Sequence, residues 1–116
     1  MRIATCYDIS NMEIFSHFGS CEYFKLYDVE DNKIIKDTII NNNGYSHHEL
    51  VELLINLDAD ILLCGGIGSH AYELLNSNNI KVIPGVNGKA DEAVKSLLNG
   101  ENIIDLSMIH ECHHKR

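Results

Sequence analysis

The run IFSHFGSCEYF, residues 14–24, places a histidine, a glycine and a cysteine between aromatic side chains. Imidazole and thiolate groups are protein ligands of transition metals and of iron–sulfur clusters. His17 and Cys21 are therefore candidate ligands for such a species. The same run could equally form a simple turn between two elements, in which Cys21 would act only as a small apolar residue.

A second group of metal-ligating residues lies near the C-terminus, where HECHH places three histidines and one cysteine in five residues. Tracts of this composition bind metals such as Zn²⁺ or Ni²⁺. Neighbouring residues cannot all reach one tetrahedron, so we expect two or three to bind at a time. A solvated chain end, or a remnant of cloning, is the alternative. The candidate ligands are His110, Cys112, His113 and His114.

A glycine-rich turn, residues 65–68 (GGIG), follows an apolar run that ends in Cys64. A turn of this kind between a strand and a helix can direct backbone N–H groups toward an anion or toward the sulfides of a cluster. It can also be a tight connection without a ligand. The four cysteines include no CxxC pair and match no secreted disulfide framework, so we expect mostly free thiols and no zinc knuckle.

The apolar pattern predicts one α/β domain that positions these groups. Strands are expected at residues 3–7, 21–29, 34–40, 61–64 and 80–86. Helices are expected after the capping box Ser46-His47-His48-Glu49, after Ser69, and over residues 90–98 with Gly100 as the helix end. Right-handed crossovers then give a five-stranded mixed sheet of order 3-2-1-4-5, with strand 2 antiparallel and three helices. This is the ribonuclease H-like arrangement.

In this topology strands 1, 4 and 5 end at one edge of the sheet, and strand 2 begins there. Ligands of open α/β sheets bind at the carboxyl ends of such strands. The edge, called the rim below, should therefore be the functional part of the domain. It collects three cysteines and three histidines: Cys6, Cys21, Cys64, His17, His47 and His48.

Charge and composition exclude several classes of function. The formal net charge is −8 and basic residues are scattered, so nucleic-acid binding is not expected. No run approaches the ~18 apolar residues of a membrane span, and no signal peptide is visible, so we expect a cytoplasmic protein. An active ribonuclease H needs several carboxylates at the centre of the sheet, whereas strand 1 carries Thr5 and Cys6 there, with only Asp8 beyond. We therefore expect no catalytic residue; a hydrolase with an unrecognised metal site is a remaining alternative.

Several motifs together resemble those of the dinitrogenase iron-molybdenum cofactor biosynthesis family, the NifX/NafY-like carrier domains. They are HFGSCEYF at residues 17–24, the Gly-Gly-x-Gly turn, and Ile80-Lys81-Val82 followed by a helix of small residues. The resemblance covers residues 1–105. It implies a ribonuclease H-like fold without nuclease activity, a role in carrying a cofactor precursor, and His17 as the favoured cluster contact. Ser69-His70 replace the basic residue that is common after the turn, and many relatives have no link to nitrogen fixation.

We therefore expect a single cofactor-carrier domain over residues 1–105 and a His/Cys-containing tail over residues 106–116. The expected cargo is an iron–sulfur or iron–molybdenum cofactor or its precursor, and the expected partners are metallocluster donor and acceptor proteins. The chain is expected to be a monomer or a weak homodimer. The alternative is a small anion- or nucleotide-binding regulatory module on the same fold, without metal. The expected cofactor-binding residues are His17, Phe18, Gly19, Cys21, Cys64, Gly65, Gly66 and Gly68, with His17 and Cys21 as metal ligands.

Overall fold

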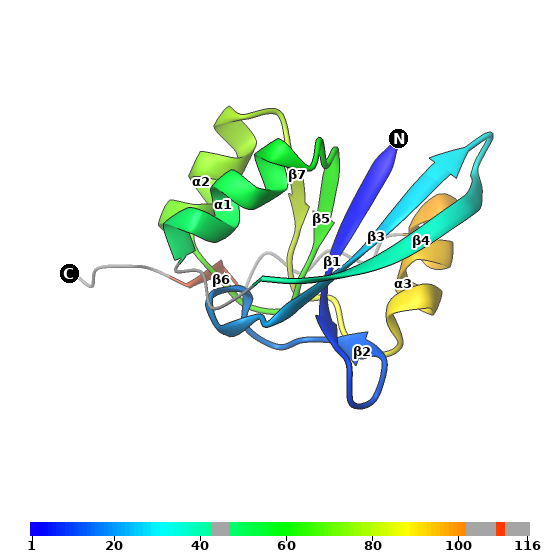
Figure 1. Ribbon diagram of the computed structural model, residues 1–116, viewed down its shortest axis with the longest axis horizontal. Helices are drawn as coiled ribbons and strands as arrows, with labels where there is room; N and C mark the ends of the chain where they lie inside the picture. The colour runs from blue at the N-terminus through cyan, green and yellow to red at the C-terminus, as the bar shows by residue number, and fades with distance from the viewer. Residues whose placement is uncertain (43–46, 102–108, 111–116) are drawn as a thin grey trace.

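A mixed β-sheet with helices on both faces forms the centre of the molecule (Figure 1), in a computed structural model that describes residues 1–42, 47–101 and 109–110. The strands of this sheet are β1 (Arg2–Asp8), β2 (Glu13–Ile14), β3 (Tyr23–Glu30), β4 (Lys33–Asn41), β5 (Ile61–Leu63) and β7 (Lys81–Ile83). The helices are η1 (Phe18–Ser20, a 3-10 turn), α1 (His47–Asn56), α2 (Ser69–Ser77) and α3 (Ala90–Leu98). β6 (Ile67–Gly68) and β8 (Ile109–His110) form a separate parallel pair.

The long strands lie in the order β4-β3-β1-β5-β7, and β2 pairs with the end of β1. β1, β5 and β7 are parallel, and β3 is antiparallel to both β1 and β4. An α/β fold with a mixed sheet and, in the described residues, three α-helices is thus confirmed. The five predicted strands correspond to β1, β3, β4, β5 and β7.

The predicted count of five strands is wrong, because the described part of the sheet has six. β2 adds an antiparallel strand to β1 through the pairs Tyr7–Ile14 and Asp8–Glu13, so the sheet order must include it. A two-residue strand in a polar loop is too short to show the apolar alternation that identifies longer strands.

The sheet buries a different apolar cluster on each face, because successive side chains of a strand point to opposite sides. In β1, Ala4 and Cys6 contribute to the core shared with α1 and α2, whereas Ile3 and Tyr7 contribute to the core shared with α3. Figure 1 shows α1 and α2 side by side on one face and α3 on the other. Among the described helices, none has the length and apolar character needed to cross a membrane.

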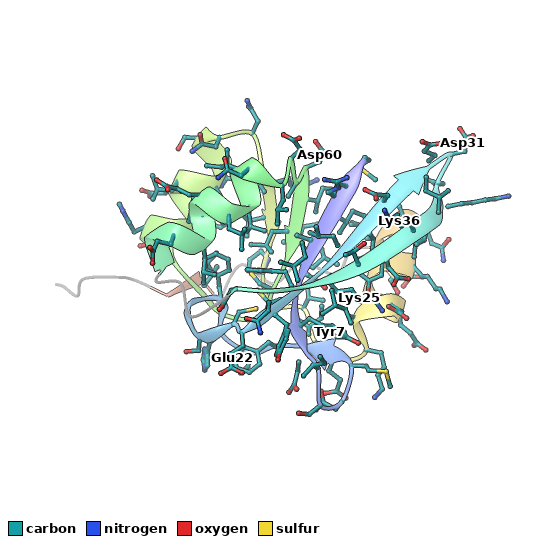
Figure 2. All side chains as sticks on the ribbon, in the orientation of Figure 1. Tyr7, Glu22, Lys25, Asp31, Lys36 and Asp60 are labelled. Carbon is teal, nitrogen blue, oxygen red and sulfur yellow. The ribbon has the colours of Figure 1, made fainter. Side chains whose placement is uncertain are left out.

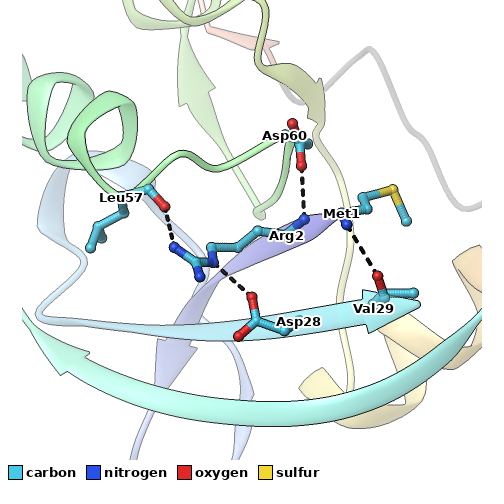
Figure 3. Close-up of polar contacts among 6 residues, drawn as sticks. All are labelled: Met1, Arg2, Asp28, Val29, Leu57 and Asp60. Atoms are coloured by element: carbon cyan, nitrogen blue, oxygen red, sulfur yellow. Dashed lines mark hydrogen bonds and ion pairs between the residues drawn. The ribbon is translucent and has the colours of Figure 1, made fainter.

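Arg2 joins three segments at the end of the sheet where β1 begins (Figure 3). Its Nε donates to Asp28 Oδ1 in β3 at 2.8 Å, and its Nη1 donates to the carbonyl of Leu57, just after α1, at 2.7 Å. Its backbone N–H donates to Asp60 Oδ2 at 2.8 Å. The hydrogen bond to Asp28 is the main cause of a raised pKa at Arg2. These contacts hold β1, β3 and the segment after α1 together at this end of the sheet.

Lys25 lies on the α3 face of the sheet, where Figure 2 shows it beside Tyr7. Its Nζ is 5.4 Å from the centre of the Tyr7 ring, 5.3 Å from that of the Tyr27 ring, and 2.9 Å from Asp91 Oδ1 in the first turn of α3. The Tyr27 hydroxyl donates to the same oxygen at 2.5 Å. A buried ammonium requires such a partner, so this network fastens α3 to the sheet.

Replacing Asp91 with asparagine should remove a pH-dependent part of the stability. The hydrogen bond from Tyr27, together with Lys25, lowers the pKa of Asp91. A carboxyl group with a lowered pKa stabilises the folded state above its unfolded pKa of about 3.9, and this contribution is lost as pH falls through the folded-state pKa. Because the Asp91 side chain is 55% exposed, we expect a contribution of about 1 kcal/mol or less after solvent screening.

Urea unfolding of the wild type and Asp91→Asn at a series of pH values measures this contribution. The difference in unfolding free energy between the two proteins should be present near neutral pH and should disappear at the acidic end of the series, when Asp91 is protonated. A difference that stays constant over the whole range would contradict the assignment, since Asp91 would then stabilise the fold by packing alone.

Candidate functional site

The loop that follows β2 lies directly on the glycine turn that follows β5. The N–H of Gly65 donates to the Phe15 carbonyl at 3.3 Å, and the N–H of Gly66 donates to the Ser16 carbonyl at 2.6 Å. In return, the N–H of Phe18 donates to the Gly66 carbonyl at 2.9 Å. These hydrogen bonds hold two distant parts of the sequence side by side at the rim.

Gly65 is required here because the two backbones are so close. A Cβ at Gly65 would lie 2.6 Å from the carbonyl oxygen of Ser16 and 2.9 Å from its carbonyl carbon. Both are backbone atoms and cannot rotate away as a side chain could. Gly65 therefore serves close packing, and it has no positive φ that would explain a glycine.

The expectation that this turn offers free N–H groups to an anion is wrong for Gly65 and Gly66. Both N–H groups donate to carbonyls of the loop, so neither is left to donate to a ligand. Gly68 is the N-cap of α2 and has an extended backbone. The anion-binding alternative therefore loses the two donors on which it depended most.

His17 is exposed at the rim. It is the N-cap of η1, with φ −138° and ψ 119°, and its backbone forms a parallel bridge with Gly66. The next residue, Phe18, is only 1% exposed and its ring centre is 6.2 Å from that of Phe24. Phe18 thus anchors the turn in the core, while Gly19 is half-buried and the His17 imidazole remains at the surface.

Three cysteines lie beneath the rim. Cys6, Cys21 and Cys64 are free, are 0% exposed and belong to the core shared with α1 and α2. The Cys21 thiol donates to the carbonyl of Tyr23 at 2.8 Å. Burial is the main cause that raises the pKa of Cys6 well above its usual value, whereas the hydrogen bond from Cys6 lowers the pKa of Cys21.

The predicted site residues therefore separate into an exposed imidazole and a buried group of thiols. Among the side chains that the structure describes, no three of His, Cys, Asp or Glu are arranged to hold a metal ion. The backbone of His110 pairs with that of Gly68, which brings the C-terminal strand β8 to the rim. The other predicted ligands of the tail, Cys112, His113 and His114, lie outside the described residues, so the zinc or nickel prediction has no support from the structure.

Two contributors to the site were not predicted. The backbone carbonyl of Ser16 accepts a hydrogen bond from the N–H of Gly66. Because every residue has such a carbonyl, the residue type at position 16 gave no indication of this contact. Asn42 is 4% exposed, and its side-chain amide donates to the carbonyl of Cys21. It belongs to an Asn-rich run that typically indicates a turn, and nothing in that run distinguishes Asn42 from its neighbours.

The sequence of this chain is similar to a known protein family and to a protein of another organism. The sequence profile of the family described as "Dinitrogenase iron-molybdenum cofactor" matches residues 1–100. The uncharacterized protein MJ0580 of Methanocaldococcus jannaschii is 28% identical over 106 residues, which span 87% of this chain and 88% of that protein.

Solved structures share the architecture. The crystal structure of PH0822 has a TM-score of 0.84 and 30% identity, and the match covers 90% of this chain and 95% of that one. The apo form of the orange protein from Desulfovibrio gigas has a TM-score of 0.77 and 21% identity, covering 90% and 92% of the two chains. At this lower identity the likeness shows the fold alone.

The substitution Gly65→Ala should destabilise the protein and disturb the rim. The added methyl group would overlap the backbone of Ser16, and such overpacking costs about 2–3 kcal/mol. Urea unfolding measures the loss, and amide NMR shifts should change most in the loop of residues 14–18.

Gly100→Ala is the matched control. Gly100 has φ +83° and no atom within 4 Å of an added Cβ, so the substitution should cost only about 1 kcal/mol through the left-handed backbone. It should leave the shifts of residues 14–18 unchanged. Equal destabilisation by both variants, without a local effect of Gly65→Ala, would show that the contact with Ser16 is not tight in solution.

Proposed function

The chain belongs to the dinitrogenase iron-molybdenum cofactor family, and we propose that it binds and carries an iron–sulfur or iron–molybdenum cofactor species, or its precursor, at the rim. The proposal describes a binding protein with a ribonuclease H-like fold, and not an enzyme. The observation that carries it is the exposed position of His17, within the part of the chain that matches the family profile. The backbone bridge to Gly66 and the buried Phe18 hold the imidazole there.

The donor set suits a cargo that must later be released. The imidazole of His17 can supply one exchangeable bond to iron. In the part of the chain that the structure describes, no three potential ligands converge on one point, whereas a permanently bound zinc ion usually has four ligands. A preassembled cluster brings its own bridging sulfides, so few protein bonds are needed to hold it.

The surroundings of His17 offer further contacts to such a cargo. β6 packs against η1, so it borders the turn that carries His17, and the C-terminal strand β8 pairs with β6. The orange protein, which shares the fold, is described in an apo form. A ligand-binding role on this fold therefore has a parallel among the solved structures.

A carrier must receive its cargo and pass it on. We accordingly propose metallocluster donor and acceptor proteins as the partners of this chain, which would act in the cytoplasm as a monomer or a weak homodimer. The net charge of −8 argues against a nucleic-acid partner.

His17→Ala should weaken cluster binding at least tenfold, a loss of ~1.4 kcal/mol or more, because one ligand to the cargo is removed. Its urea unfolding should match that of the wild type, since the imidazole is exposed. The probe is a cluster reconstituted without oxygen from ferrous iron and sulfide, with and without tetrathiomolybdate. Binding is followed by visible absorbance and by metal analysis after gel filtration.

His70→Ala is the matched control, because His70 is another exposed histidine, in the first turn of α2. It should keep wild-type cluster affinity. Equal affinity of His17→Ala and the wild type would refute the role of His17. An equal loss in both variants would show that the cluster binds nonspecifically to surface histidines.

A further inference from the structure

β4 is an edge strand of the sheet in the part of the chain that the structure describes. It pairs with β3 on one side and with no described strand on the other, and in Figure 1 it crosses the front of the sheet. An edge strand exposes backbone N–H and C=O groups that can pair with another strand. What the edge can bind depends on its side chains and on which backbone groups point outward.

The two halves of β4 differ in how well they are protected against such pairing. The half that begins the strand carries Lys33 and Lys36, and the register with β3 shifts there, between Asp28 and Val29. Lysines and bulges are features by which natural edge strands resist pairing. The other half, residues 37–41, pairs in regular register with β3 and contains no lysine, proline or bulge.

The backbone groups of Ile39 point away from β3. The N–H of Asn42 donates to the carbonyl of Glu22 at 2.9 Å, so these two residues form a hydrogen-bonded pair. Because hydrogen-bonded and non-hydrogen-bonded pairs alternate along an antiparallel ladder, every second residue from Asn42 backward bonds to β3. The residues between them, which include Ile39 and Asp37, direct their N–H and C=O groups toward the open edge.

Ile39 also presents an apolar side chain at this edge. It is 45% exposed, although isoleucine is among the most often buried residue types. Its partner on β3 is Lys25, so it lies on the face of the sheet that α3 covers. The exposed side chain therefore coincides with outward backbone groups in the unprotected half of the strand.

The residues of β4 allow one favourable register for pairing with a second copy of itself. A twofold axis places one residue opposite its own equivalent. Centring on Lys36 would oppose two ammonium groups, and centring on Asp37 would oppose two carboxylates, which destabilises a strand pair. Centring on Thr38 would place Asp37 opposite Ile39 of the second copy. Centring on Ile39 opposes two isoleucines, and Asp37 then faces the uncharged Asn41 of the second copy.

We propose that a second copy of the chain pairs antiparallel with residues 37–41 of β4, with Ile39 opposite its own equivalent, so that the two sheets join into one. The N–H of each Ile39 then donates to the carbonyl of the other. The interface is short, so the association is weak and depends on concentration. It gives the weak homodimer considered above a defined surface. The homodimer needs no cargo, so it is independent of the cluster binding proposed above.

The oligomeric state of the cargo-free full chain tests this interface. Sedimentation velocity is measured over a series of protein concentrations, in salt that screens the net charge of −8 and in a reducing buffer that excludes disulfide-linked dimers. We expect a reversible dimer. Amide hydrogen exchange, followed by NMR, should slow at Asp37 and Ile39 as the concentration rises, and it should not change at Thr38, whose N–H already donates to β3.

Ile39→Lys should raise the dissociation constant of the dimer at least tenfold, because it places two ammonium groups opposite each other at the centre of the interface. Ile35→Lys is the matched control, since Ile35 is an isoleucine of the same strand that is 58% exposed and lies outside residues 37–41. It should leave the dissociation constant unchanged. Urea unfolding of both variants checks that the fold is retained.

Three outcomes would overturn the proposal: a chain that stays monomeric at the highest concentration reached, a dimer that both substitutions weaken equally, or exchange protection that appears on another element instead of at Asp37 and Ile39. The exchange measurement uses the wild type, so it does not depend on whether either variant folds.

Discussion

The contact between the backbones of Ser16 and Gly65 is the constraint on which the rim depends. Because no side chain separates them, the loop after β2 can lie flat on the glycine turn and exchange hydrogen bonds with it. That contact determines where η1 begins, and hence where His17 stands. The glycine-rich turn thus binds another segment of its own chain, although its sequence resembles a turn that binds an anion.

The two faces of the sheet have different chemical contents. The face under α3 carries a charged network in which Lys25, the Tyr27 hydroxyl and Asp91 satisfy one another. The face under α1 and α2 carries the thiols, which belong to an apolar core. The alternation of residues along β1 and β3 separates these groups, so the thiols and the attachment of α3 do not share a residue.

Much of the fold could be predicted from the sequence, because long strands and helices leave a periodic pattern of apolar residues. The glycine turn and the aromatic run after His17 also placed the chain in its family, as the profile match over residues 1–100 confirms. The pattern could not show β2, which is two residues long and pairs with β1 only because the chain turns back on itself. Nor could it show that Asn42 holds the carbonyl of Cys21.

The sequence by itself determined the α/β class and the succession of the long strands and α-helices, and it placed His17, Cys6, Cys21 and Cys64 near one edge of the sheet. Only the tertiary structure decided which of these groups meets solvent. Phe18 and Cys21 are neighbours of His17 in the chain, yet both are buried while His17 is exposed. Burial depends on packing between distant segments, here the contact of the loop with Gly65 and Gly66. Such contacts leave no local periodicity in the sequence from which they could be read.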